Sequence, residues 1–123
     1  MTVFLAIAAG MFAQAGIAPP LVEKEVQQGD VAYSELAAGE TDTAIARIEQ
    51  NLQANPDDPA LLINLGSAWA AKGEFEKAAT YYEEAAKSDV RYRMELADGS
   101  WIDSRHAARL ALANIDAQRM AMR

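Results

Sequence analysis

Three neighbouring residues, Asp103, Ser104 and His106, carry the side-chain types of a hydrolase triad. In such a triad a serine attacks, a histidine moves the proton and an acid orients the histidine. Spacings of one to three residues cannot place nucleophile, base and acid in line. A helix beginning here would instead use Asp103 or Ser104 as its N-cap, with His106 in the first turn. We therefore expect a structural role for these residues and no catalysis.

Four glutamates, Glu74, Glu76, Glu83 and Glu84, are the other candidates for acid–base or metal chemistry. They fall on the outward side of an amphipathic helix, so we interpret them as a solvated acidic face. The chain has no cysteine and one histidine, which excludes disulfides, thiolate metal sites and multi-histidine metal centres. It also lacks a glycine-rich phosphate loop, a His-Glu-x-x-His motif and a calcium loop. The sequence predicts no enzyme, no metal and no cofactor.

The composition fits one small folded domain that does not bind nucleic acid. The chain has 123 residues, of which 51% are hydrophobic and 24% charged, and its net charge is −7. An acidic protein lacks the cations that neutralise phosphates, so nucleic acid is disfavoured as a partner. The charge is divided unevenly, because residues 23–90 hold 14 acids and 5 cations whereas residues 91–123 hold 4 acids and 6 cations.

The first 22 residues form a separate region without a charged side chain. Residues 3–12 have the length of a signal-peptide core, and Ala13-Gln14-Ala15 fits the small-x-small cleavage rule. No Lys or Arg precedes this core, which counts against a signal. We favour export to the periplasm with cleavage after Ala15. The alternatives are a membrane anchor formed by residues 3–22 and a buried N-terminal helix of the domain.

Residues 59–92 read as two helices joined by a turn. Asp58 and Pro59 are an N-cap and a first helical residue, and Gly73 ends the first helix. Small residues, Gly66 and Ala78, face each other across the pair and predict a close contact of the two helices. On that basis Gly66→Leu is expected to overpack the crossing at a cost of at least about 1–3 kcal/mol, and Gly66→Ala to be much milder. Trp69, Phe75, Tyr81 and Tyr82 fall at helical spacing and are expected in the core.

This unit resembles a tetratricopeptide repeat over a full period of 34 residues. The matching positions are Leu65-Gly66, Trp69, Gly73, Phe75, Ala78, Tyr82 and Ala85. Leu62 stands where the family usually has tryptophan, and Val90 replaces its closing proline. A weaker copy covers residues 25–58, with Gly39 and Ala44 in register with Gly73 and Ala78. Its first helix is expected at about residues 24–38.

The last third of the chain departs from the repeat. Tyr92, Met94 and Leu96 alternate with charged residues, and Asp98-Gly99 favours a turn, so a β-hairpin returning through residues 100–102 is expected. The alternative is a short irregular helix followed by a loop. A helix over about residues 104–120 would follow, and we expect Leu110, Ala111, Ile115 and Met122 on its apolar face. Truncation after Val90 should therefore damage the fold, with Trp101, Leu110 and Ile115 as its main packing residues.

The sequence thus predicts an all-α fold, with residues 1–22 as a signal or hydrophobic segment and residues 23–123 as a tetratricopeptide-like domain. This domain comprises repeats at about 25–58 and 59–92 and a cap at 93–123, in which the short β-hairpin is a possible addition.

The resemblance implies a non-catalytic scaffold that binds a protein or peptide in a groove lined by the first helix of each repeat. The corresponding groove positions are Ala60, Ile63, Asn64, Ser67, Ala70 and Ala71. Basic residues with which some family members hold a carboxylate terminus are absent from these positions. We expect such a binding protein in the bacterial cell envelope or periplasm. The alternative is a structural subunit that buries its apolar surface by self-association, as a homo-oligomer.

Overall fold

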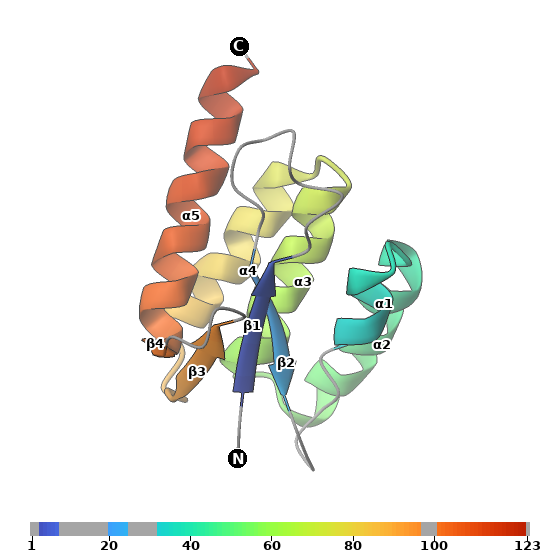
Figure 1. The fold of residues 1–123 in the computed structure, drawn as a ribbon, viewed down its shortest axis with the longest axis vertical. Coiled ribbons are helices and arrows are strands. Elements are labelled where there is room, and N and C mark those ends of the chain that lie inside the picture. Colours follow the sequence, from blue (N-terminus) through green and yellow to red (C-terminus); the bar gives the residue numbers. More distant parts are fainter. Residues whose placement is uncertain (1–2, 8–19, 25–31, 97–100, 123) are drawn as a thin grey trace.

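Two helical hairpins lie side by side in the fold, which a computed structural model describes for residues 3–7, 20–24, 32–96 and 101–122 (Figure 1). The first hairpin consists of α1 (Tyr33–Ala37) and α2 (Thr41–Ala54), and the second of α3 (Pro59–Ala71) and α4 (Phe75–Lys87). The predicted hairpins are confirmed. Helix α3 is the central element, since it packs against both α2 and α4.

The turns of the two hairpins share the same backbone geometry. Gly39 has φ 80° and Gly73 has φ 79°, which is the left-handed conformation that glycine adopts at low cost after a helix. These glycines are 34 residues apart, so each hairpin is one structural period. Asp58 caps α3 as expected, because its side chain accepts the N–H of Ala60.

The first helix is shorter than the sequence indicated. The expected helix over residues 24–38 is wrong in its N-terminal part, because Lys24 lies in a strand and α1 begins only at Tyr33. Ala32 precedes the helix with φ 54° and ψ 37°, a left-handed conformation that a right-handed α-helix cannot pass through.

The tail folds onto the second hairpin. Strands β3 (Arg93–Leu96) and β4 (Trp101–Asp103) pair antiparallel, with Met94 opposite Ile102, so the expected β-hairpin is confirmed. Its proposed turn at Asp98-Gly99 lies outside the described residues. Helix α5 (Ser104–Ala121) follows and packs against α4, as expected of a cap.

The buried face of α5 differs from the expected one. Its buried residues are Ser104, Ala107, Ala108, Ala111 and Ile115. Leu110 and Met122 are instead 47% and 73% exposed, and Trp101 at the start of the tail is 45% exposed. The reason is helix geometry: at 3.6 residues per turn, Leu110 lies about 140° around the helix axis from the buried Ile115 and therefore points toward solvent.

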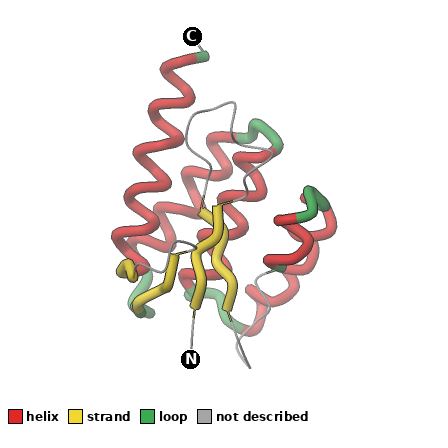
Figure 2. Tube along the Cα trace, viewed as in Figure 1, coloured by secondary structure: helices red, strands yellow, loops and turns green. Residues whose placement is uncertain are grey.

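The N-terminal region adds two strands that the sequence analysis did not predict. Strand β1 (Val3–Ile7) pairs antiparallel with β2 (Pro20–Lys24) and parallel with β3, which gives a four-stranded sheet in the order β2-β1-β3-β4. Figure 2 shows these strands next to one another, with α5 to their left and the first hairpin to their right in this view. Strand β2 lies against α3 and α1, the first helices of the two hairpins.

Candidate functional site

All six predicted groove residues lie on α3, and the structure buries most of them. Ala60, Ile63, Asn64 and Ser67 are fully buried, Ala70 is 7% exposed, and Ala71 is partly buried. Part of this cover comes from β2, which runs along α3 and α1. In the full chain, an extended segment of the chain itself thus lies against α3 and α1, the helices to which the family resemblance assigns the groove.

The sequence of α3 itself indicates that the helix is covered. Residues 59–71 contain no charged side chain, and eleven of them are buried. A helix that lines an open groove is expected to show a polar stripe on the solvent side. A helix apolar on all sides instead needs neighbours on all sides, here α2, α4, α5 and β2.

The close contact predicted between α3 and α4 is present. A Cβ atom built on Gly66 would lie 2.7 Å from the Cδ1 and Cε1 atoms of Tyr82 and 3.1 Å from the carbonyl oxygen of Ala78. The Tyr82 side chain is fully buried, and its hydroxyl lies 2.9 Å from Ser67 Oγ, within hydrogen-bond distance. Burial raises the pKa of the Tyr82 hydroxyl well above its usual range.

The other predicted core aromatics contribute in part. Trp69, Phe75 and Tyr81 are partly buried and pack against the central cluster. The Lys77 ammonium lies 4.1 Å from the centre of the Trp69 ring, a distance typical of a cation–π contact. These aromatics thus serve packing, as expected from their spacing.

A polar contact joins the start of α3 to the tail. The Tyr92 hydroxyl donates to Asp58 Oδ1 at 2.7 Å and accepts the N–H of Ala60 at 3.2 Å. Burial, followed by the neighbouring Asp58 carboxylate, raises the pKa of the Tyr92 hydroxyl far above its usual range. These two hydrogen bonds therefore join the tail to the repeat that it caps.

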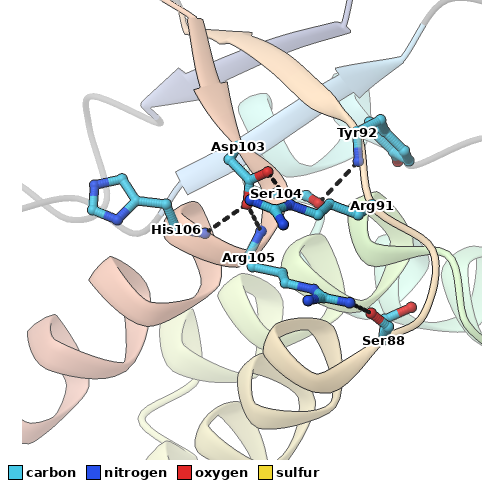
Figure 3. A network of polar contacts seen from close by, with 7 residues as sticks. All are labelled: Ser88, Arg91, Tyr92, Asp103, Ser104, Arg105 and His106. Carbon is cyan, nitrogen blue, oxygen red and sulfur yellow. Dashed lines mark hydrogen bonds and ion pairs between the residues drawn. The ribbon is translucent and has the colours of Figure 1, made fainter.

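Figure 3 shows a second group of polar contacts, around the start of α5. Asp103 accepts the N–H of Arg105 at 2.9 Å and of His106 at 3.3 Å, so of the two expected candidates Asp103 is the N-cap. Ser104 is buried, and its Oγ accepts the N–H of Tyr92 at 3.2 Å while its own N–H donates to the Tyr92 carbonyl at 2.9 Å.

The same geometry separates the three triad-type residues. Asp103 contacts His106 through the backbone N–H, and in Figure 3 the imidazole points away from the Asp103 carboxylate. Arg91 donates to the Asp103 carboxylate, which together with the two backbone N–H groups lowers the pKa of Asp103. Helix capping and ion pairing account for these contacts, and no contact joins Ser104 Oγ to the imidazole among the interactions of the described residues.

The four candidate glutamates are exposed on or beside α4, as the interpretation of a solvated face requires. Over residues 3–7, 20–24, 32–96 and 101–122, no group of three or more His, Cys, Asp or Glu side chains is arranged to hold a metal ion. Within the same ranges, no helix has both the length and the apolar character needed to cross a membrane.

Exposed apolar side chains gather instead on the tail. Leu110 and Met120 lie on α5, Met122 caps its end, and Trp101 lies on β4. Alanines at 113, 117 and 121 are also exposed and share the spacing of three or four residues with Leu110 and Met120. Helix α5 thus carries an apolar stripe on the side that faces away from the repeats.

The comparisons with known proteins agree with this architecture. A family model described as tetratricopeptide repeat matches residues 30–93, which is more than half of the 123-residue chain and covers both hairpins. No curated protein and no solved structure gave a match. Tetratricopeptide repeats generally mediate protein–protein interactions and typically act as scaffolds without catalysis. The chain belongs to the tetratricopeptide repeat family.

Proposed function

We propose that this protein is a non-catalytic scaffold that binds a protein or peptide partner in the bacterial cell envelope. The observation that carries the proposal is the position of β2, an extended segment laid against α1 and α3. This is the face on which members of the family are expected to bind a partner. The helices thus accommodate an extended polypeptide, and in this proposal an extended segment of the partner displaces β2, which requires no cofactor or metal.

The envelope location is supported by the N-terminal sequence. Residues 1–22 carry no charge, and Ala13-Gln14-Ala15 fits a cleavage site. The strands at residues 3–7 and 20–24 belong to the full chain, and cleavage after Ala15 would leave only the second of them. N-terminal sequencing of protein made in its native host tests this proposal. A chain beginning at Gly16 is expected, and an intact Met1 on a soluble cytoplasmic protein contradicts it.

Partner binding is tested by a pair of matched variants in the full chain. Ala71 is a partly buried residue at the end of the candidate groove, whereas Thr80 is exposed on α4. Ala71→Arg places a long cation beside the groove, and Thr80→Arg adds the same charge outside it. We expect a partner captured from an envelope fraction to be retained by Thr80→Arg and lost by Ala71→Arg. Equal retention by both variants contradicts the assigned groove.

A second candidate function, self-association, is favoured by the apolar stripe on α5. Leu110, Met120 and Met122 are large apolar side chains that the described part of the chain leaves exposed. Static light scattering of the full chain over a dilution series distinguishes the two candidates. A dimer that persists on dilution and is lost in Leu110→Asp favours a structural subunit, and a monomer favours the binding scaffold.

A further inference from the structure

Strand β1 has an inner position in the sheet, with a neighbouring strand on each side. Strand β1 lies between β2 and β3, pairing with β2 over five residue pairs from Val3–Lys24 to Ile7–Pro20 and with β3 at Phe4–Glu95 and Leu5–Leu96. The proposed cleavage after Ala15 lies between β1 and β2. It would remove the inner strand and leave both of its neighbours in the mature chain.

The two neighbouring strands have contacts to the helices that do not involve β1. Strand β2 lies against α3 and α1. Strand β3 pairs with β4, its Met94 side chain is fully buried, and the preceding Tyr92 is bonded to Asp58 and Ser104. With β1 removed, β2 and β3 would therefore face each other across a gap one strand wide. Each would then present unpaired backbone N–H and C=O groups, which are costly to leave without partners.

We propose that this gap is a binding slot for an extended apolar strand of a partner protein, which takes the place of β1. The proposal rests on the proposed function, because export is the event that opens the slot. The strand that fills it in the full chain defines the chemistry of the partner. It is five residues long, Val-Phe-Leu-Ala-Ile, with no charged and no polar side chain.

The neighbours of the slot also define the direction of the bound strand. It runs antiparallel to β2 and parallel to β3, and it forms backbone hydrogen bonds on both sides. A proline in its middle removes a donor and is excluded from inner strands. The partner is therefore recognised mainly through its backbone, with apolar side chains, and requires no charged terminus or phosphate.

The experiment uses the full chain with a protease recognition sequence inserted after Ala15, folded first and then cut. The probe is a fluorescent peptide of residues Val3–Ile7 with lysines added at its ends for solubility, followed by fluorescence anisotropy. The matched control chain carries an insertion of equal length that the protease cannot cut. We expect the cut chain to take up the peptide saturably. The uncut chain should bind it at least about tenfold more weakly, because its tethered β1 competes at millimolar effective concentration.

Two control peptides test the strand character of the bound probe. The Leu5→Pro peptide and a peptide with the five residues in reverse order should each bind about tenfold more weakly than the probe, or worse. Equal uptake by cut and uncut chains, or equal binding of all three peptides, would overturn the proposal. A cut chain that releases residues 1–15 would also overturn the proposal if it then loses its helical circular dichroism. The same holds if this chain forms dimers without taking up the peptide.

This assay separates the slot from the proposed export. The cut is made in vitro, so its result does not depend on processing in the cell. An intact Met1 in the native host together with peptide uptake by the cut chain would reject export, and with it the opening of the slot in the cell, while showing that the gap itself binds a strand. Cleavage at Ala15 without peptide uptake would reject the slot and keep export.

Discussion

Adding one methyl group at Gly66 tests the contact between α3 and α4 most directly. A Cβ at this position would lie 2.7 Å from two ring carbons of Tyr82, a distance that real Cβ contacts essentially never show. The Tyr82 ring cannot easily move aside, because it is fully buried and its hydroxyl is bonded to Ser67. Either the helices separate or the hydrogen bond breaks.

The expected cost of Gly66→Ala is a balance of three contributions. Overpacking a core costs about 1–3 kcal/mol, and a lost hydrogen bond adds about 1 kcal/mol. Replacing glycine by alanine within a helix returns about 1 kcal/mol. We therefore expect the free energy of unfolding to fall by about 1–3 kcal/mol, a drop in Tm of about 4 °C or more. A net gain from helix propensity is therefore not expected at Gly66, because the added Cβ meets the buried Tyr82 ring, although Gly66→Leu should still cost more.

The assay is urea and thermal denaturation of Gly66→Ala in the wild-type background and in a Tyr82→Leu background. In a Tyr82→Leu background the ring is absent, so the added methyl group should cost at least about 1 kcal/mol less than in the wild-type background. A Gly66→Ala chain as stable as the wild type would refute the reasoning. An equal cost in both backgrounds would show that the methyl group clashes with something other than the ring.

Three further predictions concern the cap and the buried tyrosines. Ile115→Ala should lower the free energy of unfolding by about 2–5 kcal/mol because Ile115 is buried. Leu110→Ala should lower it by less than about 0.5 kcal/mol because Leu110 is exposed. Chemical denaturation of the two variants tests this, and equal effects would contradict the assigned face of α5. Tyr92→Phe should cost about 1.5–3 kcal/mol in the same assay, because it removes the hydrogen bond to the Asp58 carboxylate. The raised pKa values of Tyr82 and Tyr92 favour the protonated hydroxyls in the folded state, so their contribution is complete below about pH 10, the unfolded value, and is lost as pH rises above it. Denaturation across this range should show that loss, and Tyr82→Phe should reduce it.

The sequence was sufficient for the helical hairpins because their signals are local. Asp58 before a helix and Gly73 after it act on the neighbouring backbone alone, and both occupy the positions expected of them. The N-cap role of Asp103 was predictable for the same reason. The alternation of apolar and charged residues around Met94 likewise predicted a half-buried hairpin.

The sequence did not reveal which side of α5 is buried. Ile115 and Leu110 are both large aliphatic residues, yet one is buried and the other 47% exposed. The difference depends on which face of α5 packs against α4, and that face carries the small residues at 107, 108 and 111 together with Ile115. Hydrophobicity of a single residue therefore did not predict its burial.

Only the tertiary structure decided what covers the candidate groove. The pairing of β1 with β3 joins residues about ninety positions apart, and no local pattern specifies such a partner. The sequence by itself determined the period of the repeat, its turns and its caps, because each depends on a few adjacent residues. The burial of α3 by α2, α4, α5 and β2 depends on contacts between distant segments, which exist only once the chain has folded.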